Sequence, residues 1–267
     1  MDPSGALAAD YSQRADNYAR HWAPVIHPMA RPLLDAMPFT KARKILDVGT
    51  GTGGLWPLIR SAAPGAQLYG VDRADGMLRA GNDGLHGRVA VMDAERLGVR
   101  AANFEAALLL FVLQHIPDPV RALHEVCIAL KPGGFLGVVV WGEDPGLPGG
   151  AIWAEELDRA KAAPDPRDPS VMRQSWMDTT SKLTGLLQQA GFDSDRVWSR
   201  RFVHAWTVDK LLATQTLCGL ASRRLESLSV DAQRACIDRV RTRVQELSAG
   251  ELEYHTQVIY GIAQRPE

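Results

Sequence analysis

A glycine-rich turn preceded by an acid is the part of this chain most able to bind a polar ligand. Residues 44–54 read Lys-Ile-Leu-Asp-Val-Gly-Thr-Gly-Thr-Gly-Gly, so Asp47 precedes Gly49, Gly51 and Gly53 at alternate positions. The apolar residues before the turn predict a strand that is buried on both faces. Glycines let the backbone turn tightly and approach a ligand closely. A turn of this kind after the first parallel strand is where doubly wound sheets bind nucleotide-like cofactors.

Two cofactors are compatible with this turn. Gly49, Gly51 and Gly54 match the G-x-G-x-x-G dinucleotide fingerprint, and Asp72 follows about 20 residues later, which would indicate NAD. In that case Asp47 would face a pyrophosphate, which is unfavourable because like charges repel. The spacing D-x-G-x-G-x-G, which includes Asp47, resembles motif I of the class I S-adenosylmethionine (SAM)-dependent methyltransferases. We therefore expect SAM rather than NAD.

Further segments resemble the same family, and they follow in the family's order. They are a second strand that ends in an acid, a turn with a helix start, a third strand that ends in an acid, a fourth strand with its exit, and the turn into a fifth strand (67–72, 75–78, 89–94, 104–115 and 130–140). The resemblance extends over residues 8–142. Glu105 stands where the family usually has Asp, and Leu109 and Leu110 are apolar where a polar residue is common. A backbone carbonyl of this segment can still bind the cofactor.

The resemblance implies a set of cofactor contacts. Asp47 would accept hydrogen bonds around the methionine portion, directly or through water, and Asp72 would bind both ribose hydroxyls. Met77 would pack on the adenine ring, and Asp93 would bind the adenine amino group. The product would be S-adenosylhomocysteine (SAH). The other residues implied in cofactor binding belong to the turn and to three strand ends: Gly49, Gly51, Gly53, Arg73, Ala94 and Leu110.

Two tyrosines lie in the segment before the first strand. The pattern D-Y-x-x-R-A-x-x-Y at residues 10–18 resembles the amino-terminal segment that folds over SAM in small-molecule members of the family. Tyr11 and Tyr18 are seven residues apart, so on a helix both rings can face the same way. We expect either a lid whose rings approach the sulfonium by cation–π attraction or a docking face that buries aromatic area. Residues 10–37 are expected to be helical but broken at three prolines: Pro24, Pro28 and Pro32.

His115 is the candidate catalytic base, because it follows the fourth strand directly, where that strand's end faces the transferable methyl. An oxygen or nitrogen acceptor must lose a proton, and an unperturbed histidine, with a pKa of about 6.5, has a neutral fraction able to accept it. The alternative is that His115 only holds the loop 116–119. His21 and His204 are further substrate-side candidates if the amino-terminal segment and a later insertion close over the acceptor.

The tryptophans are concentrated in the half of the chain that must build an acceptor site. Five of the seven lie at or beyond the fifth strand: Trp141, Trp153, Trp176, Trp198 and Trp206. Trp141, at the carboxyl end of that strand, is expected to line a pocket for a flat or apolar acceptor. Trp198 and Trp206 are expected instead to fill space between the core and the insertion.

The fold class expected is α/β, a Rossmann-like doubly wound sheet of seven strands in one domain. The resemblance implies the order 3-2-1-4-5-7-6 with the last strand antiparallel. The parts would be a helical lid, a SAM-binding core, a substrate-side segment, a helical insertion between strands 6 and 7, and the final strand (1–40, 41–142, 143–206, 207–250 and 251–267). An apolar stripe at helical spacing predicts a helix in the insertion, either a cap over the substrate or a packing or dimerisation helix: Val230, Ile237, Val240, Val244 and Leu247.

The composition suits a globular enzyme, with 46% apolar residues and a net charge of −1. The arginines are dispersed rather than gathered in a basic footprint, so we do not expect nucleic-acid binding. No apolar run is long enough to span a membrane, and the first residues lack the pattern of a signal peptide. Three widely spaced cysteines, without metal-ligand spacing, suit a reducing cytoplasm, and no metal site is expected.

The sequence therefore predicts methyl transfer from SAM to an oxygen or nitrogen of a small molecule, preferably a secondary metabolite. The enzyme would be cytoplasmic and a monomer or homodimer. Three alternatives are open. The first is carbon methylation of a quinone precursor, and the second is a non-methylating protein that keeps the SAM fold as a cyclase or binding module. The third is an NAD-linked oxidoreductase.

Overall fold

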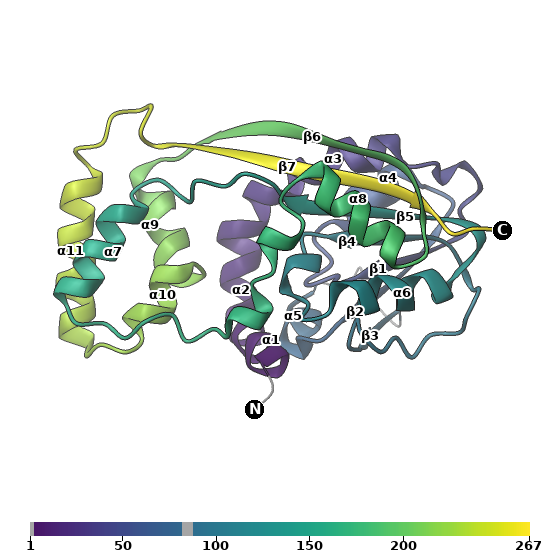
Figure 1. Ribbon diagram of the computed structural model, residues 1–267. Coiled ribbons are helices and arrows are strands. Elements are labelled where there is room, and N and C mark those ends of the chain that lie inside the picture. Colours follow the sequence, from purple (N-terminus) through teal and green to yellow (C-terminus); the bar gives the residue numbers. More distant parts are fainter. Residues whose placement is uncertain (1–2, 82–87) are drawn as a thin grey trace.

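A seven-stranded sheet organises the computed structural model, which describes residues 3–81 and 88–267 (Figure 1). Residues 1–2 of the expected lid and 82–87 of the expected core lie outside the described residues. The strand order is β3-β2-β1-β4-β5-β7-β6, and β7 is antiparallel to both of its neighbours, which confirms the predicted order. The strands are β1 Lys44–Val48, β2 Gln67–Asp72, β3 Val89–Val91, β4 Phe104–Leu110, β5 Leu130–Trp141, β6 Asp193–Ala205 and β7 Glu253–Gln264.

Helices cover both faces of the sheet, as the uninterrupted apolar strands predict. In β4, Ala106, Leu108 and Leu110 point to one face, and they pack in the same cluster as the apolar residues of α3 and α4. Ala107 and Leu109 point to the other face, where α6 and α8 cover them. The helices named here are α3 Ala23–Ala36, α4 Trp56–Ala62, α6 Pro119–Ala129 and α8 Thr180–Gln189, and α5 Asp75–Ala80 follows β2.

The amino-terminal segment is more continuously helical than expected. It comprises α1 Pro3–Gln13, α2 Ala15–Asn17, a π-helical turn Tyr18–Trp22 and α3. The expectation of breaks at the prolines is wrong, because α3 runs through Pro28 and Pro32. The three prolines are four residues apart, so the lost hydrogen bonds fall on one face, away from the apolar residues of α3 that are buried against the sheet. Burial of that opposite face stabilises the helix despite them.

A long hairpin carries a separate group of helices beyond the sheet. The pairing of β6 with β7 continues to Ala205–Glu253, whereas β5 pairs with β7 only as far as Trp141–Val258. The overhang leads into α9 Val208–Leu217, α10 Leu220–Leu225 and α11 Val230–Val244, and α7 Gly150–Arg159 packs with them. Figure 1 shows this group, here called the cap, on the far side of α1 and α2 from the sheet.

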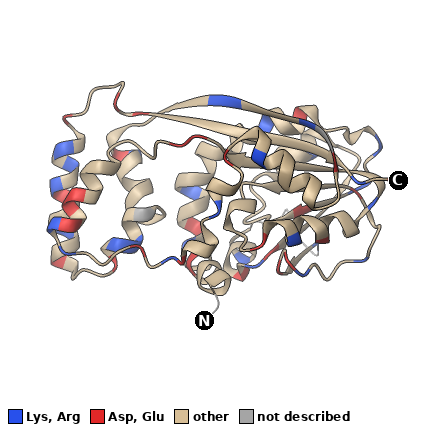
Figure 2. Cartoon of the chain, viewed as in Figure 1, with Lys and Arg blue, Asp and Glu red and all other residues tan. Residues whose placement is uncertain are grey.

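A buried carboxylate joins two helices of the cap. Glu156 of α7 is 1% exposed, and its two oxygens accept hydrogen bonds from Arg239 Nε (2.7 Å) and Arg243 Nη1 (3.0 Å) of α11. Figure 2 shows acidic and basic segments on these two facing helices. Of the predicted apolar stripe, Val240 and Val244 are fully buried, but Val230 is 70% exposed because it is the first residue of α11, directly after the Ser229 N-cap.

Candidate functional site

The glycine turn after β1 adopts a backbone conformation that only glycine accepts easily. Gly49, Gly51 and Gly53 all have positive φ angles, of 75°, 56° and 68°. At Gly49 there is also no room for a side chain, since a Cβ would lie 2.4 Å from Cγ2 of Val112. The amides of Gly49 and Thr50 donate to the carbonyl of Val71, at 2.8 and 3.0 Å, and this fixes the turn against β2.

The Asp47 side chain forms hydrogen bonds within the turn and the helix that follows it, and it does not face the cavity. Its Oδ2 accepts hydrogen bonds from Thr50 Oγ1 (2.6 Å) and Trp56 Nε1 (3.0 Å), and the side chain is buried. Burial raises the pKa of Asp47 to about 6. Neither Asp47 nor Gly53 borders the cavity formed by the other predicted cofactor residues. The structure therefore places both of them in the scaffold of the turn.

Asp72 lies at the centre of the predicted cofactor site. Its Oδ2 accepts a hydrogen bond from the Gly51 amide, and its Oδ1 accepts one from the Ala74 amide, both at 2.8 Å. Burial raises the pKa of Asp72, while these backbone bonds favour its ionised form. The carboxylate is thus held at the end of β2 with lone pairs remaining for ribose hydroxyls. Arg73 forms an ion pair with Asp93, 3.2 Å between Nη1 and Oδ2.

One cavity brings most of the predicted cofactor residues together. It is bordered by Tyr11, Tyr18, Gly49, Gly51, Asp72, Arg73, Met77, Asp93, Ala94, Leu110 and His115. Sequence reasoning missed Phe111 and Val112, which also border it. Phe111 has a φ of 60°, an uncommon conformation for an aromatic residue that is often found near functional sites. A sequence offers no signal for such a conformation in a non-glycine residue.

Tyr11, Tyr18 and His115 border this cavity and a second one, so they mark the junction between the two. Tyr11 Oη lies 3.2 Å from Nε2 of His115, and Nδ1 of His115 lies 3.4 Å from the Val171 carbonyl. Because a carbonyl only accepts, Nδ1 carries the proton, and Nε2 accepts from the Tyr11 hydroxyl. Burial lowers the pKa of His115 to about 4, so the imidazole is neutral at physiological pH.

The second cavity has a volume of about 440 Å³, within the range of small-molecule sites. One part of its wall is aromatic, with the predicted Trp141 beside Trp22, Trp153 and Tyr254. The rings of Trp141 and Trp22 are 6.2 Å apart. The other part is polar, and its residues come from the segment after β5 and from the cap: Gln174, Arg167, Thr214, Gln215, Arg223 and Arg224.

His21 and His204 border neither of these two cavities. The backbone carbonyl of His21 accepts a hydrogen bond from Thr214 Oγ1 at 3.4 Å, so this residue joins the amino-terminal segment to α9. The His204 ring lies 4.6 Å from that of Trp206 at the outer end of β6. The arrangement therefore gives no support to the expectation that His21 and His204 lie on the substrate side.

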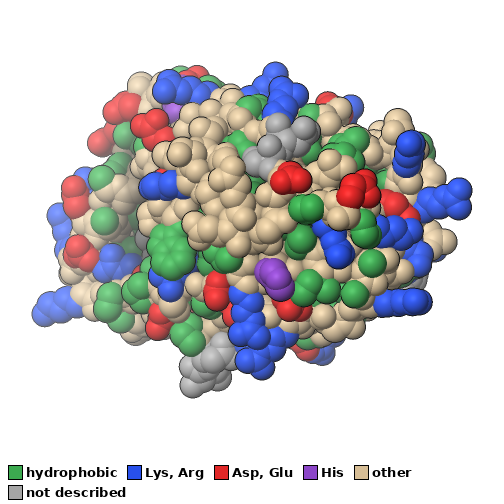
Figure 3. All heavy atoms as spheres, turned by 45° about the vertical axis from the view of Figure 1, so that its right-hand side comes forward, with side chains coloured by type: hydrophobic (Ala, Val, Ile, Leu, Met, Phe, Trp, Pro, Cys, Tyr) green, Lys and Arg blue, Asp and Glu red, His purple; other side chains and the backbone are tan. Residues whose placement is uncertain are grey.

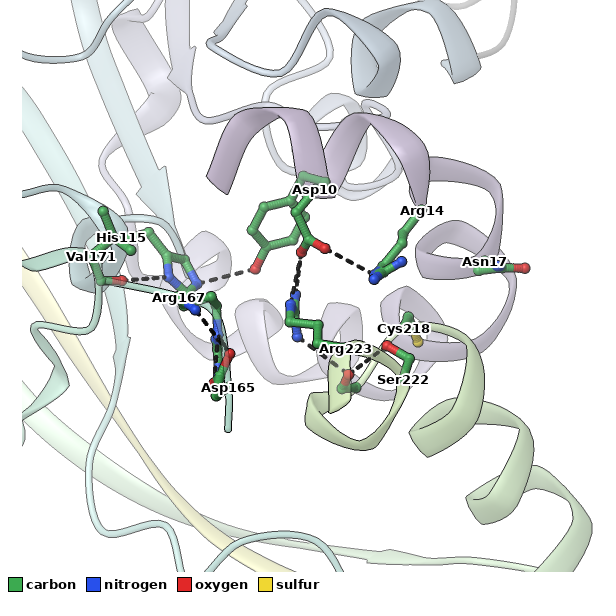
Figure 4. Close-up of polar contacts among 12 residues, drawn as sticks. Asp10, Arg14, Asn17, His115, Asp165, Arg167, Val171, Cys218, Ser222 and Arg223 are labelled. Atoms are coloured by element: carbon green, nitrogen blue, oxygen red, sulfur yellow. Dashed lines mark hydrogen bonds and ion pairs between the residues drawn. The ribbon is translucent and has the colours of Figure 1, made fainter. Parts of the chain in front are cut away.

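Ion pairs join the amino-terminal helices to the cap across the junction. Asp10 of α1 pairs with Arg223 of α10 (2.5 Å from Oδ2 to Nη2), and Arg14 pairs with Glu226 (2.6 Å). Figure 4 shows Asp10 placed between Arg14 and Arg223, which both point toward it. These contacts fix α1, which contributes Tyr11 to the border of both cavities, against the cap.

Metal-binding groups, membrane-crossing helices and the distribution of charge also bear on function. Among the described residues, no group of three or more His, Cys, Asp or Glu could hold a metal ion. None of the described helices combines the length and apolar character that crossing a membrane requires. On the face shown in Figure 3, basic and acidic side chains are interspersed and do not form a single charged patch.

Comparison with known proteins bears on the strands that carry the first cavity. Residues 46–138 match the sequence model of a family described as a methyltransferase domain. Over this segment, the chain is similar to that family. The predicted resemblance to class I methyltransferases, whose methyl donor is SAM, is therefore confirmed for the part of the chain that forms the first cavity's strands.

Two curated relatives match part of the chain. The demethylmenaquinone methyltransferase of Thermus thermophilus is 37% identical over 115 residues, which are 41% of this chain and 51% of the relative. The aklanonic acid methyltransferase DauC of a Streptomyces species is 30% identical over 131 residues, 46% of this chain and 60% of the relative. The chain thus spans between half and two thirds of these relatives.

A solved structure shares the fold over nearly the whole chain. The crystal structure of the cyclase SpnF superposes with a TM-score of 0.61 at 19% identity, and the match covers 98% of this chain and 97% of SpnF. At this level of identity the match shows a common fold.

Proposed function

We propose that this chain transfers the methyl group of SAM to an oxygen or nitrogen of a small molecule. The observation that carries the proposal is the junction at Tyr11, Tyr18 and His115, where the predicted cofactor cavity meets a second, partly aromatic cavity. An acceptor in the second cavity would be held next to a methyl group presented from the first. Positioning of this kind can supply much of the rate acceleration.

The residues of the first cavity fit SAM. At Gly51, which borders the cavity, a Cβ would lie 3.2 Å from Met77 Cε, so the glycine leaves the space between the turn and Met77 open. Asp72 would bind the ribose hydroxyls, and Met77 and Asp93 would contact the adenine. Tyr11 and Tyr18 would place aromatic rings near a sulfonium. Bound there, SAM supplies an electrophilic methyl group on a cationic sulfur.

We propose His115 as the proton acceptor wherever the acceptor atom is protonated. Its Nε2 is unprotonated, and the Val171 carbonyl holds Nδ1 in the protonated tautomer. Burial raises the pKa of Tyr11, so its hydroxyl stays protonated and can turn from Nε2 to donate to an acceptor. With a pKa of about 4, His115 is always available but is a weak base.

The rate of methyl transfer should be independent of pH between about pH 6 and pH 8, because His115 is neutral throughout this range. A histidine base with an ordinary pKa would instead lose half of its activity at about pH 6.5. The measurement is kcat/KM for the acceptor from pH 5 to pH 8 at saturating SAM. A titration midpoint near neutrality would contradict the assigned state of His115.

The direct test of the proposed function is incubation with methyl-labelled SAM and a metabolite extract, followed by mass analysis. We expect at least one metabolite to gain a single methyl group, and excess NADH not to compete. The curated relatives are named for different acceptors, so carbon methylation of a quinone precursor stays an alternative that the product's structure would reveal. SAH binding without any methylated product would instead favour the cyclase or binding-module alternative.

A further inference from the structure

Positive side chains dominate the polar wall of the second cavity. Arg167, Arg223 and Arg224 all border it, whereas Asp144 is the single carboxylate among the described residues that do so. Each arginine is paired with a carboxylate that lies outside the cavity: Asp165, Asp10 and Asp158, respectively. These carboxylates fix the guanidinium groups from behind. The charged groups that an acceptor would meet on this wall are therefore mainly guanidinium groups.

Arg167 is the arginine best placed to bind an anion. Its Nε and Nη2 bind Asp165, at 3.0 and 2.7 Å from Oδ2, and the side chain is 21% exposed. Within residues 3–81 and 88–267, Nη1 of Arg167 has no hydrogen-bond partner. Arg223 is more enclosed, since Asp10 holds Nε and Nη2, and Nη1 makes a 3.3 Å bond to the Gly219 carbonyl. A guanidinium fixed on one edge can offer the remaining donor to a carboxylate without further ordering.

The positive charges of Arg167 and Arg223 change the pKa values of two side chains at the junction, where methyl transfer would occur. Burial lowers the pKa of His115, and the positive charges of Arg167 and Arg223 lower it further. The same charges favour ionisation of the Tyr11 hydroxyl, against the larger effect of burial. Figure 4 shows Arg167 beside His115, and Arg223 on the other side of Arg167, pointing toward Asp10. An anion bound by Arg167 would thus lie next to the transferable methyl.

From this arrangement we propose that the acceptor is a carboxylic acid with a flat apolar body, and that the product is its methyl ester. This inference rests on the proposed function. Arg167 binds the ionised carboxylate, and the aromatic wall around Trp141 contacts the apolar body. One carboxylate oxygen forms a bond to the methyl carbon while the carbon–sulfur bond breaks and its electrons pass to sulfur, giving SAH. No proton is released, so a weakly basic His115 suffices.

The first test separates this inference from the function on which it rests. The enzyme is incubated with methyl-labelled SAM and a metabolite extract. The product mixture is then split into two portions, and the label is analysed in an untreated portion and in a portion treated with mild alkali. Hydroxide cleaves methyl esters to methanol but leaves methyl ethers and methylamines intact. We expect most of the incorporated label to become volatile methanol. Absence of any label would refute the proposed function, whereas alkali-stable label would refute the ester alone.

The second test asks whether the protein prefers a carboxylate ligand to an uncharged one. Calorimetry on the SAH complex compares naphthoate with naphthamide, which differ in charge but have the same ring. Naphthoate should bind at least about ten-fold more tightly, because hydrogen bonds between charged groups are the stronger ones. Equal affinities, or no binding of naphthoate, would overturn the proposal.

An Arg167→Gln variant should lose this preference while keeping its affinity for SAH and its melting temperature. The matched control is Arg241→Gln, on α11, which pairs with Asp209 at 2.7 Å and borders neither cavity. The control should discriminate between the two probes as the unaltered protein does. A preference for naphthoate that survives in Arg167→Gln would remove Arg167 from the proposal.

Discussion

Replacing Asp72 with alanine should weaken SAH binding about 10- to 150-fold, which corresponds to about 1.5–3 kcal/mol for hydrogen bonds to a charged group. The variant loses the proposed ribose contact. It also loses the acceptor for the Gly51 and Ala74 amides, so the turn that forms the cavity is less well fixed. Isothermal titration calorimetry with SAH measures the effect.

Asp35→Ala is the control for this experiment, because within the described part of the chain Asp35 makes only an exposed ion pair, with Arg31 on α3. Its affinity for SAH should equal that of the unaltered protein. Unchanged SAH affinity in Asp72→Ala would show that the carboxylate does not contact the cofactor.

Gly49→Ala should reduce the free energy of unfolding by about 2–4 kcal/mol, from the sum of backbone strain at positive φ and overpacking. The added Cβ would lie within 3 Å of Val112 Cβ and Cγ2, and a β-branched side chain has little freedom to move away. Because Val112 borders the first cavity, its displacement should also weaken SAH binding. Urea unfolding and calorimetry measure the two effects.

Gly185→Ala provides the matched control. Gly185 lies within α8, and a Cβ there would meet nothing within 4 Å. Alanine should therefore stabilise the protein, by about 0.5–1 kcal/mol, because it restricts the unfolded chain and favours helix. If Gly49→Ala were equally well tolerated, the account of the turn would be wrong.

The sheet and the acids at its edge could be predicted from sequence for one physical reason. Parallel strands in a doubly wound sheet end at the same edge, so residues that follow successive strands converge in space. This rule placed Asp72, Asp93 and His115 around one cavity. The continuous apolar character of β4 likewise predicted burial on both faces, which the alternation of Ala107 and Leu108 between the two core clusters confirms.

Features that depend on contacts between distant segments could not be predicted in the same way. The indole of Trp56 and the hydroxyl of Thr50 hold Asp47 behind the turn, although its spacing in the motif suggested a ligand contact. Arg223 borders the second cavity from α10 of the cap, which its ion pair with Asp10 joins to α1, and no local pattern in the sequence signals this contact. Proline frequency suggested breaks in α3, but burial of the opposite face outweighs the local cost.

A crystal structure with SAH bound tests the central claim most directly. The account predicts the ribose hydroxyls on Asp72, the adenine between Met77 and Asp93, and the sulfur beside Tyr11 and His115, directed into the second cavity. SAH bound elsewhere, or a first cavity left empty at saturating SAH, would contradict it.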